Sequence, residues 1–143
     1  MADNIKNTFK AWLAGFIDGE GCIAISYYYH KDGRKKHYLS LRIAQKFQEP
    51  LLKIQEIYGG SVCYTDCRPK NQVYIHITSA KKAERILRDV LPYLTVKKAQ
   101  AELALKFRDI KRGSKGHVPT PQVVWEEREA LRKIMQSLKK VYM

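Results

Sequence analysis

The stretch Leu13-Ala14-Gly15-Phe16-Ile17-Asp18-Gly19-Glu20-Gly21 decides the fold, because it is a short apolar helix that ends in a carboxylate between two glycines. Gly15 and Gly19 lie four residues apart, so they share one helix face and let another backbone approach closely. Such a pair alone favours packing within the chain. A second copy of the helix is the other partner, and a twofold axis would then bring two Glu20 carboxylates together. The interface residues expected for that case are Leu13, Gly15, Phe16 and Gly19.

The net charge of the chain indicates which class of partner it binds. Lys and Arg number 27 against 14 Asp and Glu, which gives a formal charge of +13. Such an excess attracts polyanions, and DNA or RNA is the first candidate. No apolar run approaches the roughly 20 residues of a membrane span, and residues 1–4 lack the basic start and apolar core of a signal peptide. We therefore expect a soluble, intracellular protein that does not act on membranes.

The alternation of apolar and polar residues predicts an α+β fold in a single domain, residues 1–143, with an antiparallel sheet. Asp32-Gly33 is a hairpin turn signal between the first two strands. The predicted elements are helix 9–21, strands 22–30 and 37–46, helix 50–58, strands 61–67 and 72–78, a helix after Ser79, and helices 95–111 and 122–140. The order is αββαββα, followed by a C-terminal helical extension of about residues 117–143.

The motif from Leu13 to Gly21 resembles the LAGLIDADG signature of homing endonucleases. Its single copy resembles the intron-encoded members that act as homodimers. The resemblance implies a saddle-shaped sheet over a long, pseudo-palindromic DNA site and Mg²⁺-dependent cleavage of both strands, with Mn²⁺ as an alternative ion. The family's metal ligand is the penultimate motif residue, here Glu20 in place of the commoner aspartate, assisted by the backbone carbonyl of Gly19. Asp18 cannot share a helix face with Glu20, so we expect it to cap or hydrogen-bond locally.

The resemblance implies two further active-site residues. Gln45, just after the second strand, corresponds to a polar residue that orients water near the scissile phosphate. Lys97 resembles a lysine that stabilises developing phosphate charge, and Lys98 is the alternative in register. A second basic residue often follows the position of Gln45, whereas this chain has Glu49-Pro50, so the composition of the basic pocket stays open. For each lysine alone, a solvated helix charge is the plain alternative.

The strands predict a sheet with one apolar face and one basic, hydrogen-bonding face. The outward side chains can contact base edges and phosphates in a major groove, which admits a β-ribbon. A merely solvated face is the alternative for any single residue, but the set beside a charge of +13 favours DNA. The expected DNA-binding residues are Ser26, Tyr28, His30, Arg34, Lys36, Tyr38, Ser40, Arg42, Gln72, Tyr74 and His76.

Three other functions stay open from the sequence. An RNA maturase would prefer structured intron RNA, which makes RNA the less favoured partner. A DNA-binding regulator would bind a specific site without metal-dependent cutting. A basic scaffold or ribosome-associated protein would bind in a strongly salt-dependent way with no preferred sequence. The intact motif, with its carboxylate at Glu20, favours active cleavage over all three.

Overall fold

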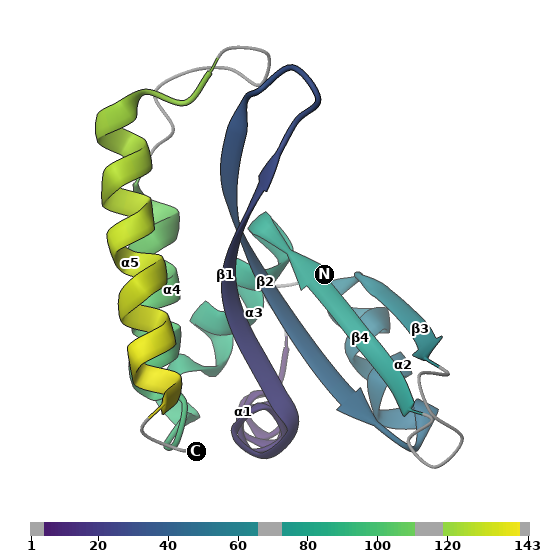
Figure 1. Cartoon of the computed structure of the whole chain (residues 1–143). Helices are drawn as coiled ribbons and strands as arrows, with labels where there is room; N and C mark the ends of the chain where they lie inside the picture. The colour runs from purple at the N-terminus through teal and green to yellow at the C-terminus, as the bar shows by residue number, and fades with distance from the viewer. Residues whose placement is uncertain (1–4, 66–72, 111–118, 141–143) are drawn as a thin grey trace.

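The computed structural model describes residues 5–65, 73–110 and 119–140. Four antiparallel strands form one sheet in the order β1-β2-β4-β3. The predicted order of helices and strands is confirmed (Figure 1). The elements are α1 (Asn7–Glu20), β1 (Gly21–Tyr29), β2 (Lys35–Gln45), α2 (Gln48–Tyr58), β3 (Ser61–Thr65), β4 (Val73–Ser79), α3 (Ala80–Val90), a 3-10 turn (Leu91–Tyr93), α4 (Lys98–Asp109) and α5 (Gln122–Lys140).

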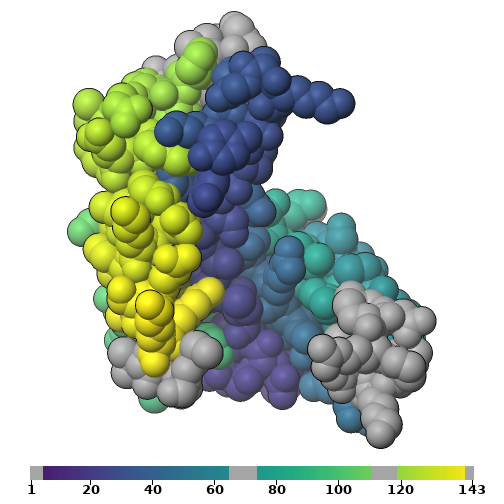
Figure 2. All heavy atoms as spheres, viewed as in Figure 1, coloured from purple at the N-terminus to yellow at the C-terminus, as the bar shows by residue number. Residues whose placement is uncertain are grey.

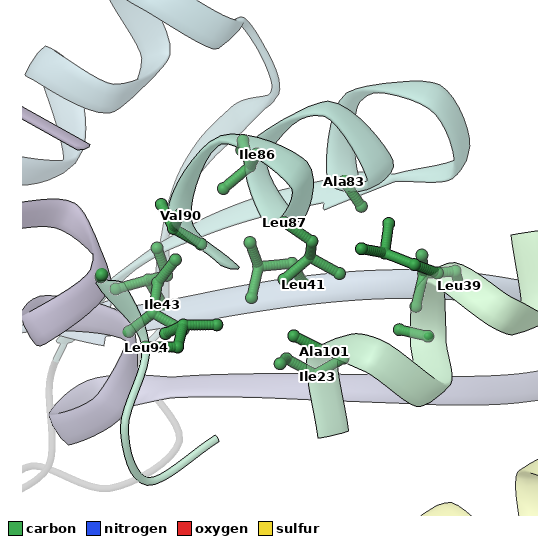
Figure 3. Close-up of a cluster of buried hydrophobic side chains, with 14 of the residues drawn as sticks. Ile23, Leu39, Leu41, Ile43, Ala83, Ile86, Leu87, Val90, Leu94 and Ala101 are labelled. Atoms are coloured by element: carbon green, nitrogen blue, oxygen red, sulfur yellow. The ribbon is translucent and has the colours of Figure 1, made fainter. Parts of the chain in front are cut away.

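The core lies between the sheet and the helices on one of its faces. In Figure 1, α2 and α3 lie behind the strands, so the other face of the sheet is turned to the viewer. Figure 3 shows the side chains of α3 meeting those of β2. The residues at this contact are fully buried, as expected for a helix with one apolar stripe; they are Leu39, Leu41, Ile43, Ala83, Ile86, Leu87 and Val90.

The hairpin between β1 and β2 turns where the sequence predicts it. Gly33 has φ +89°, a backbone conformation that favours glycine. The carboxylate of Asp32 accepts hydrogen bonds from the backbone N–H of Arg34 at 3.1 Å and from its Nε at 2.6 Å. The turn therefore fixes the register in which Ile23 pairs with Leu41.

The predicted orientation of β4 is wrong by one residue. The register pairs His76 with Ile43 and Thr78 with Leu41, so these residues face the helices, and Tyr74 lies on the same side. His76 is fully buried, and its Nε2 donates a hydrogen bond to the carbonyl oxygen of Gly59 at 2.8 Å. Because this bond satisfies the N–H donor of the buried imidazole, the inner position can hold a polar side chain.

The isoleucines of β4 take the opposite face. Ile77 pairs with Arg42 and Ile75 with Ala44, so both lie on the open side of the sheet. Tyr74 and His76 are therefore not on the face predicted to contact DNA. Gln72, predicted to face outward with them, lies outside the described residues.

Helix α5 packs against the hairpin strands through an aromatic and charged contact. His37 and Trp125 lie with their rings 4.0 Å apart, and Nε2 of His37 donates to Glu129 at 2.9 Å. Arg132 also binds Glu129, at 2.7 and 2.8 Å. The guanidinium, with His37 as a second donor, lowers the pKa of Glu129 to about 2. This contact holds the C-terminal helix alongside β1 (Figure 1).

None of the helices in the described ranges combines the length and the hydrophobicity needed to cross a membrane.

Two buried histidines should make stability depend on pH. Burial lowers the pKa of both His37 and His76, so both imidazoles stay neutral in the folded chain. The unfolded chain, with histidine pKa values near 6.5, takes up protons that the folded chain does not. Stability is therefore full well above pH 6.5 and falls as the pH drops below it, towards the lowered pKa values of the folded chain.

The variant His76→Gln tests this, because glutamine can still donate to Gly59 but does not titrate. Urea unfolding of both proteins at several pH values between about 7.5 and 5 should give a shallower fall for the variant. An identical pH dependence would contradict the assignment of His76 as a buried neutral group.

Candidate active site and nucleic-acid interface

Helix α1 carries two different faces. Leu13, Ala14 and Ile17 are fully buried in the core of the chain. On the other side, Gly15 and Gly19 are exposed, and a Cβ atom added at either would meet nothing within 4 Å. The prediction that Leu13 contributes to an interface with a second chain is therefore wrong, because its side chain is already used in the core.

The exposed face of α1 is largely apolar. Trp12 is 41% exposed, and its ring lies 5.3 Å from that of Phe16, which is half-buried. Trp12 precedes Gly15 by three residues and Phe16 by four, so all three share one face with Gly19. Trp12 is not among the predicted interface residues, although the same helical spacing indicates its place.

Glu20 is the last residue of α1, and its side chain is exposed. Strand β1 begins at the next residue, Gly21, without a linker. A Cβ atom at Gly21 would lie 2.8 Å from the carbonyl oxygen of Ile17 and 2.9 Å from its Cγ2. Glycine is therefore required for the helix to pass directly into the strand, and that passage places Glu20 at the junction.

Asp18 links this junction to a distant part of the chain. Its carboxylate accepts hydrogen bonds from the backbone N–H groups of Thr95 and Lys97, both at 2.9 Å. The prediction of a local role for Asp18 is therefore wrong. So is the predicted start of the following helix at Thr95, because these N–H groups bind the carboxylate and α4 begins at Lys98.

The same contact decides between the two candidate lysines. Nζ of Lys97 donates to the backbone carbonyl oxygen of Asp18 at 2.8 Å, and the side chain is half-buried. Lys98 is exposed and is the first residue of α4. Lys97 is thus the lysine whose side chain lies at the end of α1, where it binds the backbone two residues before Glu20.

Gln45 is the last residue of β2, at the end of that strand that lies next to the start of β1. Gly21 pairs with Ile43, so Gln45 lies two residues beyond the partner of the first residue of β1. Its Oε1 accepts a hydrogen bond from the backbone N–H of Lys46 at 2.8 Å. The structure therefore gathers Glu20, Gln45 and Lys97 around one junction, although they come from three different elements.

A pocket of about 230 Å³ opens beside this junction. One charged side chain in this pocket, Lys139 from the last turn of α5, is not among the predicted site residues. No local pattern indicates this position, because it depends on how α5 packs. The pocket is lined by Gly21, Cys22, Val96, Lys97, Gln100 and Lys139.

The open face of β1 and β2 carries most of the predicted DNA-binding residues. The register pairs Tyr28 with Lys36 and Ser26 with Tyr38, on the side away from the buried Ile23 and Leu39. Arg42 lies on the same side and is exposed.

Three further residues predicted for this surface have different outcomes. Ser40 also lies on the open face, but it is only 6% exposed, so its predicted exposure is wrong. His30 and Arg34 lie at the hairpin end, where the ring of His30 is 4.9 Å from that of Tyr28. Arg34 is held there by Asp32.

The described part of one chain contains no group of three or more His, Cys, Asp and Glu side chains that would hold a metal ion. Glu20 is a single exposed carboxylate, and the backbone of Gly19 beside it is uncovered. Carboxylate and carbonyl oxygens are the ligands that hard divalent cations prefer. The donors present at the junction therefore suit such a cation, and a second chain would double their number.

Comparison with known proteins identifies relatives along most of the chain. Residues 13–112 match the family model of the LAGLIDADG endonuclease. The chain is 35% identical to the DNA endonuclease I-CvuI of Chlorella vulgaris over 104 residues, which cover 68% of this chain and 62% of that protein. It is 32% identical to I-CreI of Chlamydomonas reinhardtii over 109 residues, which cover 75% and 66%. The matches span less than two thirds of either relative's length.

Solved structures show the same fold. Crystalline I-CvuI, in complex with the I-CreI target in the presence of 2 mM Mg, matches with a TM-score of 0.78 and 27% identity over 92% of this chain and 82% of that one. The archaeal endonuclease I-Vdi141I, complexed with DNA, matches in fold with a TM-score of 0.75 at 19% identity, over 93% and 86%. From the matched motif, its extent and the shared fold, the chain belongs to the LAGLIDADG endonuclease family.

Proposed function

We propose that the protein is a homing-type endonuclease that acts as a homodimer and hydrolyses both strands of a long, pseudo-palindromic DNA site. The observation that carries the proposal is the exposed carboxylate of Glu20 at the end of α1. The side chain of Lys97 lies beside it, because it binds the backbone carbonyl of Asp18, two residues before Glu20. The relatives support it, since both are named DNA endonucleases, and the I-CvuI structures contain DNA.

The homodimer is supported by the exposed face of α1. Gly15 and Gly19 leave the backbone uncovered, and Trp12 and Phe16 flank them with apolar surface. Two copies of this helix crossing at a twofold axis would bury that surface and place both Glu20 side chains at one centre. A palindromic DNA site has the matching symmetry.

A divalent cation, Mg²⁺ in our proposal, fits the donors at this centre. Glu20 from each chain and the carbonyl oxygen of Gly19 would hold it. Structures of I-CvuI obtained in the presence of Mg and of Ca are consistent with a divalent ion. When bound, such an ion supplies activation of water and stabilisation of the leaving oxygen.

The remaining side chains act on the phosphate and on water. Lys97 is half-buried, so its ammonium group offsets negative charge on the scissile phosphate more strongly than a solvated lysine would. Gln45 has an amide group at the same edge of the sheet and would orient the attacking water. Asp18 positions Lys97, because it binds both the backbone and, through its own carbonyl, the side chain of that residue.

The open face of the sheet would contact the DNA. Its aromatic and hydroxyl groups can contact bases, and its cations can contact phosphates. The isoleucines Ile75 and Ile77 on β4 add apolar surface that can meet thymine methyl groups. The residues of the predicted set that we retain for this role are Ser26, Tyr28, His30, Arg34, Lys36, Tyr38 and Arg42.

The variant Glu20→Gln should abolish cleavage and leave DNA binding largely intact, because it removes the metal-binding charge but keeps the side-chain shape. The test is a selection of cut sequences from a pool of palindromic and near-palindromic DNA. It is run at several Mg²⁺ and Mn²⁺ concentrations, because the I-CvuI structure with 2 mM Mg holds uncleaved DNA. Cutting by the variant at the wild-type rate would contradict the role of Glu20, and preferential binding to structured RNA would favour a maturase.

The variant Asp18→Asn should slow cleavage at unchanged DNA affinity, because asparagine offers one acceptor where two backbone N–H groups need one each. We expect a loss of about 1–2 kcal/mol in the free energy of unfolding from the unsatisfied donor. Asp109→Asn is the matched control, since that carboxylate is exposed at the end of α4. Equal cleavage rates for the two variants would contradict the positioning role.

The variant Gly15→Leu should give a folded monomer. A side chain at this position meets nothing within the chain, so folding is unaffected, but it would block close approach of a second α1. Sedimentation should then give a mass near 16.6 kDa in place of twice that value. Ala99→Leu, at an exposed position of α4, is the control for added apolar surface. A dimer that survives Gly15→Leu would place the interface elsewhere.

A further inference from the structure

Lys139 lies far along the chain from the motif but close to it in space. Its Nζ donates to Sγ of Cys22 at 3.6 Å, across 117 residues of sequence. Cys22 follows Glu20 by two residues and is exposed on the open face of the sheet, where it pairs with Arg42. In Figure 2 the C-terminal end of α5, in yellow, borders the purple atoms of the N-terminal segment. The last turn of α5 therefore delivers an ammonium group to the motif junction.

This ammonium group shares a pocket with Lys97. Both lysines line the space of about 230 Å³ next to Gly21. None of the ion pairs formed within the described residues includes either lysine. Two like charges at one pocket repel each other, and an anion between them removes that cost. The pocket is thus suited to a phosphate group.

The contacts of Lys139 leave its binding capacity largely unused. An ammonium group has three donors, and a thiol is a weak acceptor. A phosphate oxygen would give a charge-assisted hydrogen bond, which is roughly twice as strong as a neutral one. The side chain is also half-buried, which restricts the positions its Nζ can take.

On the side of Gln45 the next residue, Lys46, is exposed beyond the end of β2 and does not line this pocket. The first turn of α2, which follows that residue, contains the acidic side chain of Glu49. A second cation at the junction is available from α5, through Lys139.

We propose that Lys139 is a further phosphate-binding residue of the active site, which contacts the DNA backbone at the pocket that it shares with Lys97. The inference rests on the proposed nuclease function. It assigns to the C-terminal helix a direct part in the reaction, in addition to its packing against the hairpin through Trp125 and Glu129.

The test compares Lys139→Met, Lys139→Arg and Lys140→Met in the full chain. Methionine keeps the aliphatic packing of the side chain and removes its charge, and Lys140 is an exposed lysine at the same helix end. DNA recovered from the selection, or a mixed-sequence duplex if nothing is cut, is titrated in Ca²⁺ at several salt concentrations. Single-turnover cleavage in Mg²⁺ and thermal unfolding are measured on the same proteins.

We expect Lys139→Met to lower the slope of log affinity against log salt by about 0.9, the value for one lost phosphate contact. Its cleavage rate should fall about 10–100-fold. Lys139→Arg should keep the slope and most of the rate, and Lys140→Met should match the wild type in rate.

Four outcomes bear on the inference. A lower slope for Lys139→Met in a protein that cuts no DNA would sustain the phosphate contact and refute the nuclease. Wild-type slope and rate for Lys139→Met would overturn the inference and leave the nuclease intact. Equal losses for Lys139→Met and Lys140→Met would overturn it as an effect of general charge. A parallel loss of thermal stability and rate at unchanged slope would overturn it as a packing role.

Discussion

The carboxylate of Asp18 is the contact on which the arrangement of the candidate site depends. It joins α1 to the segment before α4 by two hydrogen bonds of 2.9 Å to backbone N–H groups. A negative charge is favourable at the start of a helix, where N–H groups have no partner within the helix. The bond satisfies those groups and, at the same time, brings Lys97 next to Glu20. One interaction thus serves both folding and the proposed chemistry.

Helix α1 has a buried face and an exposed face with different roles. Its buried face, with Leu13 and Ile17, belongs to the core of the chain, whereas its exposed face has glycine where a side chain would separate two backbones. The absence of a Cβ atom at Gly21 then lets the strand begin directly after the helix. A dimer built on the exposed face would place Glu20 at its centre without altering the core of either chain.

The pattern of apolar and polar residues predicts those elements whose faces are set by neighbouring residues along the chain. The alternation is clearest in β2, where Leu39 and Leu41 each have polar neighbours on both sides. In β4 the alternation predicts that the isoleucines face the core. The structure buries His76 there instead, because the carbonyl of Gly59 at the end of α2 accepts its hydrogen bond. The start of α4 and the place of Lys139 depend on contacts across 77 to 117 residues, which no window of sequence contains. The resemblance to the family predicts Glu20, Gln45 and Lys97 as site residues, and the fold brings the ends of their three elements together.

In the proposed homodimer, two chains share one metal centre built from their Glu20 carboxylates. The most direct measurement is a crystal structure of the protein on its selected DNA site, grown with Mn²⁺ and recorded for the anomalous signal of that ion. We expect anomalous density between the two Glu20 side chains at the twofold axis, beside the scissile phosphates. Glu20 side chains far apart, or manganese density bound only by other residues, would contradict it.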